Sequence, residues 1–411
     1  MTSETREAMR QDETQLAPGS LSGLRVLDLS RILAGPTATQ LMADLGAEVI
    51  KVEKPDVGDD TRSWGPPFLP DAEGNDSDLS AYFLCANRNK KSIAIDITSE
   101  DGVALLRRLV AISDVVVENY KPGDLARRGI GYEDLRHIKP DIIWCSISGF
   151  GQTGPYSDRI GYDFLIQAMG GIMSITGEPD AAGGQPVKVG VGIADVMCGM
   201  YATVGVLAAL RHRDRTGQGQ HIDLALYDSQ VAWLINAATN HLVSGRVPKR
   251  LGNAHPNIAP YQTFAASDEH LAVAVGNDQQ FLRFTEAIGR ADLATDDRFR
   301  RNRDRLANLE ALQALIQAEI GKDTALAWEQ RLLGVGVPAG RVATIETVLT
   351  DPHTLARGMV VELPGDETED PVRLLGNPLK MSVTPVQYRS RPPHLDADRE
   401  AVLRLLESEA D

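Results

Sequence analysis

Two glycine-rich stretches of the sequence contain residues that could do chemistry. Residues 149–154 read Gly-Phe-Gly-Gln-Thr-Gly, the G-x-G-x-x-G spacing with which some strand–turn–helix units hold the pyrophosphate of a dinucleotide. Residues 186–202, PVKVGVGIADVMCGMYA, place Asp195 where a glycine-rich loop meets an apolar helix. A carboxylate at such a point commonly caps the free amides of the helix, and spacing alone does not raise Asp195 above that role.

The first stretch does not stand where a dinucleotide site requires it. That site occupies the first strand-to-helix turn and leads directly into the helix. Here the glycines follow the fifth predicted strand, and Pro155 comes directly after the last of them. The first turn, at 31–36, reads RILAGP and has a single glycine. We therefore interpret residues 149–154 as a bent loop beside a ligand channel, which argues against a nicotinamide-dependent dehydrogenase.

Motifs for metals, phosphate loops and acyl hydrolysis are missing from the sequence. The eight histidines show no H-x-x-x-H spacing, the three cysteines form no C-x-x-C pair, and neither a G-x-S-x-G elbow nor a P-loop occurs. We predict no metal site and no disulfide framework, which suits a reducing cytoplasm. The net charge of −15 argues against general nucleic-acid binding, whereas local basic clusters suit a small polyanionic ligand.

The elements that must position these residues alternate between strand and helix in the N-terminal half. We predict strands at 24–30, 48–54, 92–97, 114–119, 141–148 and 221–228. We predict helices at 37–46 after the Gly35-Pro36 break, with Gly46 as C-cap, and at 101–112, 196–213 and 229–243, the last capped by Asp228. This alternation is typical of βαβ units, so the predicted fold class is α/β with a Rossmann-like parallel sheet.

The composition of the sequence changes near residue 245. A stretch rich in Gly, Pro and Asn precedes a predicted strand at 270–276 and charged helices across 278–333. We interpret this part as a smaller α+β domain. The sequence has no run of about 18 apolar residues, so no membrane span is predicted. The predicted boundaries are a mobile polar segment at 1–20, a large Rossmann-like domain at 21–240, a linker at 241–262, the small domain at 263–340, a second linker at 341–365 and a return to the large domain at 366–411.

Across residues 21–395 the sequence resembles the class III CoA-transferases, a family that includes formyl-CoA transferase and is related to the α-methylacyl-CoA racemases. Ordered matches carry the resemblance, among them LSGLRVLDLSRILAGPTATQLMADLGAEVIKVEKP, GDDTRSWGPPF, NRNKKSIAIDI, VVVENYKPGDLARRGIGYEDL, SISGFGQTGP, GYDFLIQAMGG and VGIADVMCGMYA. The resemblance implies an interlocked homodimer, acyl-CoA and carboxylic acid substrates, and no cofactor beyond CoA itself.

The resemblance also implies a catalytic role for Asp195, which matches the family's nucleophile. Its carboxylate would attack the acyl-CoA thioester, form a mixed anhydride and then an aspartyl-CoA thioester, and pass CoA to an acceptor carboxylate. Amides of the glycine-rich loop would stabilise the oxyanions. The racemases carry Gly-His-Asp where this sequence reads Gly161-Tyr162-Asp163. Because tyrosine is a poor base near neutrality, we favour a transferase over a racemase or epimerase.

Residues for CoA binding follow from the same matches. The large domain at 21–240 is implied to bind CoA. Lys54 is implied to approach the nucleotide phosphate, and Ile95, Asp96 and Thr98 to lie in the segment that contacts the base and ribose. The implied CoA contacts are Lys54, Ile95, Asp96, Thr98, Asn119, Tyr120, Arg127 and Arg159. A non-catalytic acyl-CoA binding protein on the same scaffold is the remaining alternative, and the retained Asp195 weighs against it.

A narrower resemblance predicts the acids. Formyl-CoA transferases carry a run of glycines ahead of the small-domain strand, and this sequence has none there. Its residues 58–68, 87–94 and 249–255 resemble the succinyl-CoA:glutarate type, so we predict succinyl-CoA as donor and a dicarboxylic acid as acceptor. A free carboxylate needs a cationic partner. The substrate candidates are Arg88, Arg250, His255 and Tyr162, the last of which replaces the histidine of the racemase motif.

Overall fold

The computed structural model describes residues 18–71, 73–365 and 371–409, and the chain forms two compact units. The first unit comprises the described parts of Met1–Gly171, Val189–Ile235 and His353–Asp411, and the second comprises Ile172–Lys188 and Asn236–Pro352. Residues 172–188, predicted within the large domain, thus belong to the second unit, and the chain returns to the first unit earlier than predicted. Most of the predicted segment at 1–20 lies outside the described residues.

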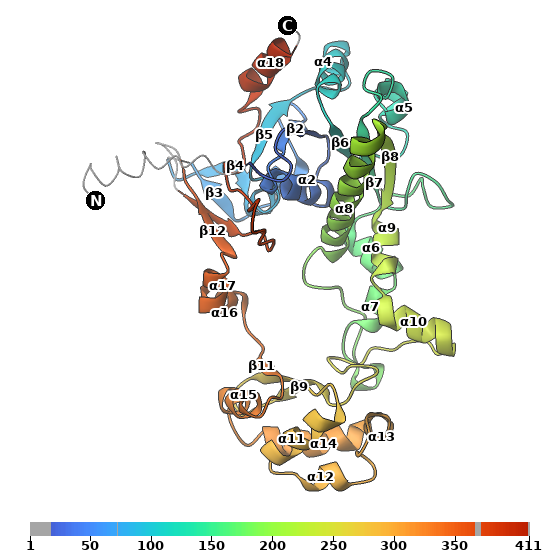
Figure 1. The fold of residues 1–411 in the computed structure, drawn as a ribbon, viewed down its shortest axis with the longest axis vertical. Coiled ribbons are helices and arrows are strands. Elements are labelled where there is room, and N and C mark those ends of the chain that lie inside the picture. Colours follow the sequence, from blue (N-terminus) through green and yellow to red (C-terminus); the bar gives the residue numbers. More distant parts are fainter. Residues whose placement is uncertain (1–17, 72, 366–370, 410–411) are drawn as a thin grey trace, which may run out of the picture. The chain divides into compact units, whose positions relative to one another are not determined.

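A six-stranded parallel sheet forms the centre of the first unit (Figure 1). Its strands are β1 (Arg25–Asp28), β2 (Glu48–Glu53), β5 (Lys90–Ala94), β6 (Val115–Glu118), β7 (Ile143–Ser148) and β8 (Gln220–Ala225). The spatial order is β5-β2-β1-β6-β7-β8, and all neighbours pair in parallel. Counted along the chain this order is 3-2-1-4-5-6, that of doubly wound nucleotide-binding folds. The predicted α/β class and parallel sheet are confirmed.

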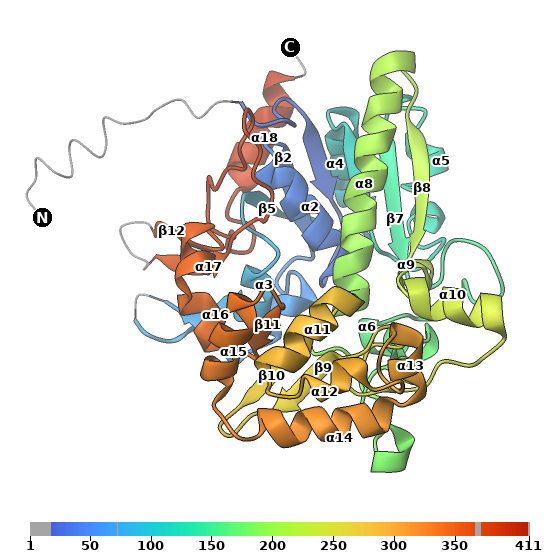
Figure 2. The same ribbon diagram turned by 60° about the horizontal axis from the view of Figure 1, so that its bottom comes forward.

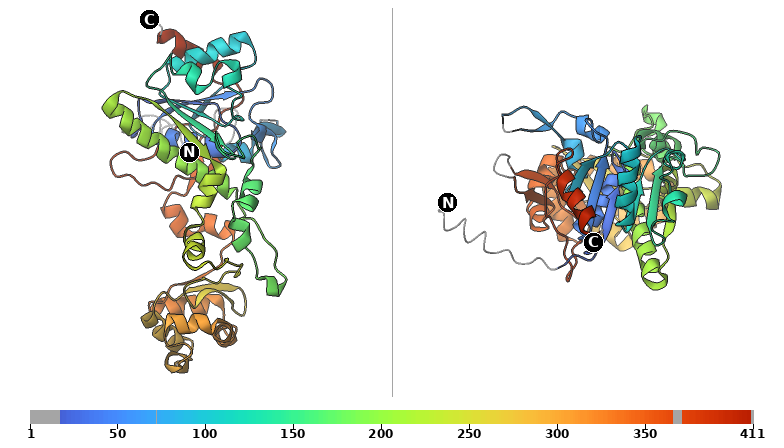
Figure 3. Two further views of the ribbon diagram at one scale, coloured as in Figure 1. Left: turned by 90° about the vertical axis from the view of Figure 1, so that its right-hand side faces the viewer. Right: turned by 90° about the horizontal axis from the view of Figure 1, so that it is seen from above.

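Helices cover both faces of this sheet (Figures 2 and 3). One face packs against α2 (Ala34–Asp44) and α8 (Ile193–Thr216), and the other against α4 (Glu100–Ala111), α5 (Tyr132–Leu135) and α18 (Arg399–Ser408). Neighbouring residues of one strand serve opposite layers, as the strand period of two requires: Val26 faces α2, whereas Leu27 faces α4. Helix α8 is long and apolar enough to cross a membrane, but 56% of its most apolar window is buried, as in the core helix of a globular domain.

The helices α2 and α8, and the helix that follows β8, each begin three residues before their predicted starts. Helix α2 begins at Ala34, so Pro36 lies in its first turn, where a missing N–H costs little because first-turn amides lack an intrahelical acceptor. Gly46 (φ +108°) follows the cap residue and donates its N–H to Ala43 O at 3.0 Å. The predicted strand at 221–228 ends at Ala225, because α9 (Leu226–Ala232) begins there. Asp228 is therefore inside the first turn of α9 and is not its cap.

The predicted helix at 229–243 is in fact divided. Helix α9 ends at Ala232, and α10 (Ile235–Ser244) follows after a break at 233–234. The break lies where the chain passes from the first unit to the second, at Ile235 and Asn236. Continuous helical periodicity could not show this, because the boundary between the units is a long-range property.

The second unit combines an antiparallel three-stranded sheet with short helices. The strands β9 (Tyr261–Ala265), β10 (His270–Ala274) and β11 (Ala339–Arg341) lie in the order β11-β10-β9. The helices are α7 (Ile172–Ile175), α10, α11 (Asp278–Ala287), α12 (Asp292–Thr295), α13 (Asn302–Ala307), α14 (Leu309–Ile320), α15 (Ala325–Gly334) and α16 (Ile345–Thr350). Its core joins Phe264 and Leu271 of the sheet to Phe281, Phe284 and Trp328 of the helices. Strand β9 begins inside the predicted linker.

The remaining described elements belong to or end in the first unit. They are the hairpins β3 (Phe68–Pro70) with β4 (Asp76–Ser80) and β12 (Val360–Leu363) with β13 (Val372–Leu375), and the helices α3 (Ala81–Leu84), α6 (Asp163–Met169) and α17 (Pro352–Ala356). Three short 3₁₀ turns lie at Asp60–Ser63, Ala126–Arg128 and Asp180–Ala182, the last of them in the second unit. The turn at Asp60–Ser63 is capped by the side chain of Asp59, which accepts from Thr61 N.

Candidate active site

Asp195 is the third residue of α8 and lies in its first turn. The N-cap of this helix is Gly192, so the carboxylate of Asp195 does not hold the cap position that its sequence context also allowed. Within the described part of the chain, no hydrogen bond reaches this carboxylate. The positive end of the α8 dipole favours negative charge at this point. The side chain is therefore held on a core helix while its oxygens stay available for a reaction.

Another carboxylate performs the capping. Asp163, the first residue of α6, accepts from Ala194 N at 2.8 Å with Oδ1 and from Gln167 Nε2 at 2.8 Å with Oδ2. Gln167 Oε1 in turn accepts from Val189 N at 2.8 Å. These contacts bind the glycine-rich loop to α6 and satisfy the amide of Ala194 in the first turn of α8. Asp163, and not Asp195, therefore caps this end of α8.

The surroundings of Asp195 make its ionised form costly. Burial, together with the smaller effect of the negative charge of Asp163, raises the pKa of Asp195 to about 7. Burial also raises the pKa of Tyr82 to about 12, with Asp195 as the next cause, so the phenol of α3 stays protonated close to the carboxylate. A carboxylate that is poorly solvated and poised near neutrality is typical of a catalytic group.

A cavity of about 310 Å³ opens in front of Asp195. Its walls come from the carboxyl ends of β1, β6 and β7, where the order of the sheet reverses direction and where doubly wound folds bind their ligands. Its lining includes Arg31, Asn119, Tyr120, Arg159, Tyr162, Asp163 and Asp195. Sequence elements far apart along the chain thus meet at one carboxylate.

A second cavity of about 510 Å³ lies beyond the first, and the two share Arg31, Tyr120 and Asp124. It is formed at the carboxyl ends of β2, β5 and β6. Five of the predicted CoA contacts line it, namely Lys54, Ile95, Asp96, Thr98 and Tyr120. Arg128 joins them, so three cations reach this cavity. A path lined by cations at one end and by Asp195 at the other suits a long ligand with phosphates at one end and a reacting group at the other.

Residues 21–399 match the sequence profile described as CoA-transferase family III. The chain belongs to this family. It is accordingly a family III CoA-transferase, and the loop at 149–154, which follows β7 and leads into no helix, is a family segment rather than a nicotinamide site.

Relatives of this transferase cover almost its whole length. It is 48% identical over 395 residues to the succinate–glutarate CoA-transferase of Agrobacterium fabrum, covering 94% of this chain and 96% of the relative. It is 42% identical over 384 residues to the succinyl-CoA:glutarate CoA-transferase of Mus musculus, covering 93% and 86%. The crystal structure of a CAIB/BAIF family protein from Brucella suis is 48% identical, with a TM-score of 0.84 over 95% of this chain and 100% of that one.

Asn119 and Arg127 of the transferase, both predicted CoA contacts, also interact with neighbouring residues, and of the two only Asn119 lines a cavity described above. Asn119 brackets the backbone of Arg31: its Oδ1 accepts from Arg31 N at 2.9 Å, and its Nδ2 donates to Arg31 O at 2.7 Å. Arg127 forms an ion pair with Asp124 and lines neither cavity, whereas its neighbour Arg128 does line the second. Asn119 thus joins β1 to β6 across the point where the order reverses.

The tentative substrate residues of the transferase are divided between the two units. Arg88 is buried, forms an ion pair with Asp44 and donates to Leu375 O at 2.7 Å, which is a structural role, so we set it aside as a substrate contact. Tyr162 is 57% exposed and lines the first cavity, as does Arg159, whose guanidinium stacks over the Tyr156 ring.

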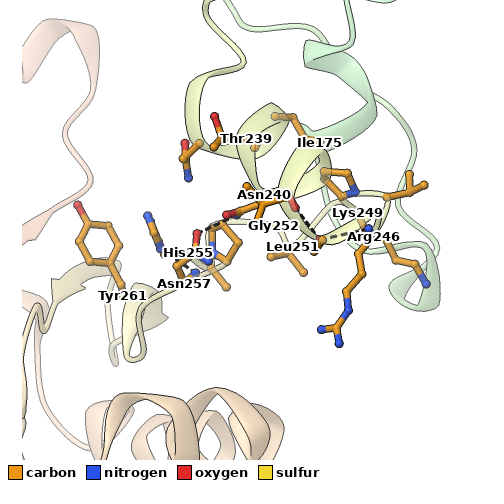
Figure 4. Close-up of a pocket in the computed structure, with 18 of the residues that line it drawn as sticks. Ile175, Thr239, Asn240, Arg246, Lys249, Leu251, Gly252, His255, Asn257 and Tyr261 are labelled. Carbon is orange, nitrogen blue, oxygen red and sulfur yellow. Dashed lines mark hydrogen bonds between the residues drawn. The ribbon is translucent and has the colours of Figure 1, made fainter.

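The other two candidates, Arg250 and His255, lie in the second unit. Arg250 pairs with Asp180, and its Nε donates to Glu178 O at 3.2 Å. His255 lines a cavity of about 690 Å³ together with Arg246 and Lys249 (Figure 4). The contacts of Arg250 and the cavity that His255 lines are thus formed by residues of the second unit.

Several residues of the site were not singled out from the sequence. Asp163 and Gln167 are four residues apart, which places them on one face of α6, and this spacing was a usable signal for a pair that holds a common partner. Arg31 and Arg128 carried only a general signal of positive charge. The described residues include no cluster of three or more His, Cys, Asp or Glu side chains arranged to hold a metal ion.

Proposed function

We propose that this enzyme transfers CoA from succinyl-CoA to glutarate or a closely related dicarboxylic acid, with Asp195 as the nucleophile. The observation that carries the proposal is the Asp195 carboxylate, free of hydrogen bonds among the described residues and facing a cavity that continues into a cation-lined one. The names of the two relatives above support the choice of donor and acceptor. CoA enters as a substrate, and the proposal includes no other cofactor.

The proposed reaction passes through two covalent forms of Asp195. Its oxygen attacks the succinyl thioester carbon, the C–S bond breaks, and CoA leaves as a thiolate. The thiolate attacks the Asp195 carbonyl carbon of the mixed anhydride, which releases succinate and leaves an aspartyl-CoA thioester. Glutarate displaces CoA from that thioester by the same steps in reverse, so glutaryl-CoA leaves and the Asp195 carboxylate is restored. The overall reaction exchanges one acyl-CoA thioester for another of similar energy, and covalent catalysis divides this exchange into easier steps.

The test is mass spectrometry of CoA esters after the enzyme meets succinyl-CoA and a panel of acids. The panel contains glutarate, other dicarboxylates of different length, and monocarboxylates of matched length. We expect glutaryl-CoA to form in amounts matched by the succinate released. New esters from monocarboxylates alone would contradict the dicarboxylate assignment. No new ester from any acid, together with deuterium uptake from heavy water at the α-carbon of a branched acyl-CoA, would favour the racemase.

Arg128 is expected to bind the phosphates of CoA, and Arg127 is not. Arg128→Ala should raise the KM for succinyl-CoA about tenfold with little change in kcat, because a charged hydrogen bond to phosphate is lost from the second cavity. Arg127→Ala is the matched control, since it neighbours Arg128 but pairs with Asp124, and its KM should change less than about twofold. Steady-state kinetics of both variants decide between them, and the reverse ranking would favour the residue named from the family match.

Lys54 allows a sharper version of the same measurement. It is exposed at the end of β2 and lines the second cavity. Lys54→Ala should raise the KM for succinyl-CoA about fivefold, and this effect should disappear with succinyl-3′-dephospho-CoA if Lys54 meets the 3′-phosphate. An equal loss with both thioesters would place Lys54 at the pyrophosphate instead.

We further propose that the enzyme is a homodimer, interlocked as the family resemblance implies, and that it works in the cytoplasm. An apolar strip on α8 supports self-association: Met200, Tyr201, Val204 and Leu207 are 50%, 41%, 64% and 37% exposed. An apolar face of this kind is covered in most soluble proteins. Light scattering of the purified enzyme should give twice the mass of one chain, and a monomer mass at micromolar concentration would contradict the dimer.

A further inference from the structure

Ile32, on the wall of the cavity that contains Asp195, has an unusual backbone conformation. Its φ is +71°, the left-handed region that a β-branched side chain rarely adopts because of steric clash. Ile32 lies between β1 and α2, in the loop at 29–33, and Arg31, Ile32 and Leu33 all line the cavity. Such a conformation persists only where the surroundings hold it in place, and it commonly occurs at functional sites.

A buried ion pair holds this loop. Asp59 accepts from Ile32 N with Oδ1 at 3.2 Å and Oδ2 at 3.3 Å. Lys51 Nζ donates to Asp59 Oδ2 at 2.8 Å and to Ser30 O at 2.9 Å. Both charged side chains are 0% exposed. The pair thus contacts the backbone of the loop at Ser30 and at Ile32, the residue with positive φ.

Two further contacts fix Asp59 and the loop. Thr61 donates to Asp59 Oδ1 from its N–H at 3.0 Å and from its hydroxyl at 2.8 Å. Asn119 holds both backbone groups of Arg31, as described above. Asp59 belongs to the GDDTR segment at 58–62, one of the matched motifs, for which the cavities and the proposed chemistry provide no direct role. Asp59 and Lys51 line neither cavity, and the part of the cavity wall that they contact is the loop.

We propose that the Lys51–Asp59 ion pair is a positioning device for CoA transfer, which holds Ile32 in its left-handed conformation and so fixes the 31–33 wall of the Asp195 cavity. The inference rests on the proposed function, since it takes this cavity as the place of reaction. Loss of the pair releases Ile32 toward ordinary backbone angles and moves the wall. Misplacement of a reacting group by about 1 Å costs on the order of a hundredfold in rate, so the effect falls mainly on kcat.

The test begins with Asp59→Asn, which keeps the size of the side chain and removes its charge. We expect kcat to fall about ten- to hundredfold, while the KM for succinyl-CoA changes less than about threefold. Asp44→Asn is the matched control, because Asp44 also forms a buried ion pair, with Arg88, and lines neither cavity. It should lower the melting temperature with kcat within about twofold of wild type.

Rescue by glycine separates positioning from general stability. Glycine adopts positive φ at no steric cost, so Ile32→Gly added to Asp59→Asn should restore kcat at least about fivefold without restoring the melting temperature. If Asp59→Asn does not fold, Thr61→Val, which removes one hydrogen bond to Asp59, replaces it under the same criteria. Equal kcat losses in the Asp59 and Asp44 variants, or no rescue by glycine, would overturn the proposal. An inactive wild-type enzyme would instead contradict the proposed function.

Discussion

Asp195→Ala should abolish CoA exchange, with kcat reduced by about four orders of magnitude or more, because the proposed reaction loses the carboxyl group whose oxygen first binds the acyl group and whose carbon then binds the sulfur of CoA. CoA should still bind with an affinity within about threefold of wild type, since the cations that we propose as partners of its phosphates lie in the second cavity. Mass spectrometry of CoA esters and calorimetric titration with CoA measure the two quantities. Full exchange activity in the variant would remove Asp195 from the mechanism, and loss of CoA affinity would point to a damaged fold.

The buried carboxylate of Asp195 should lower the stability of the fold at the pH values where the proposed reaction needs it ionised. The folded-state pKa of Asp195 is about 7, above its ordinary value of 3.8. Between these two pH values the folded chain keeps a proton that the unfolded chain has lost, so the stability of the fold decreases as pH rises through this window and the full cost is present above it. Asp195→Asn removes the charge and should stabilise the fold at pH 8 by about 1–2 kcal/mol, after allowance for partial solvent access.

Melting temperatures at two pH values check this prediction. Asp195→Asn should melt several degrees above wild type at pH 8, and the difference should shrink at pH 5, where the wild-type carboxyl is protonated in the folded state. A lower melting temperature than wild type at pH 8 would show that the carboxylate stabilises the fold, as a helix cap would.

Substitution of Asp163 should have the second largest effect on activity, because Asp163 both positions the start of α8 and raises the pKa of Asp195. Asp163→Ala removes the acceptor for Ala194 N and the partner of Gln167, so the start of α8 loosens and kcat should fall about a hundredfold. Wild-type kcat/KM should rise with pH to a plateau through about 7, because Asp195 must be ionised to attack. Asp163→Asn keeps an acceptor for Ala194 N but removes the negative charge, and should shift this rise to lower pH.

Rate profiles between pH 5 and 9 measure the shift. Asp228→Asn is a matched control, since Asp228 is also an acid in the first turn of a helix of the first unit, and its charge is not among the causes that raise the pKa of Asp195. Its profile should coincide with that of wild type. A rise near pH 4 in the wild type, or a shift to higher pH in Asp163→Asn, would contradict the assigned coupling between the two carboxylates.

Much of the scaffold was predictable because it depends on local patterns. The runs of β-branched residues at 48–54 and 114–119 became buried parallel strands, and helix α4 begins one residue before its predicted start. Family matches identified Asp195 and grouped Lys54, Ile95 and Asp96, which do line one cavity. The role of Asp195 as nucleophile stays a prediction, since geometry places the carboxylate and only kinetics can show its reaction.

Charged side chains were the least predictable part of the site. Arg305, in an arginine-dense stretch typical of a solvated surface, is fully buried and donates to Ala259 O and Phe299 O. Arg88, a candidate for substrate binding, is buried against Asp44, 44 residues earlier in the chain. Nothing in a local pattern indicates whether a charge will meet solvent, ligand or a distant partner, because that depends on which segments fold against it.

The amino-acid sequence therefore settled the class of the fold, the order of its strands and helices, and the family, since hydrophobic periodicity and ordered motifs are properties of neighbouring residues. Only the tertiary structure determined which partner each charged side chain contacts. Asp163 caps α8 by accepting from Ala194 N, 31 residues later in the chain, which leaves the carboxylate of Asp195 available. Asp59 accepts from Ile32 N, 27 residues earlier. Buried charges must find partners when water is removed, and those partners are selected by packing in three dimensions rather than by spacing along the chain.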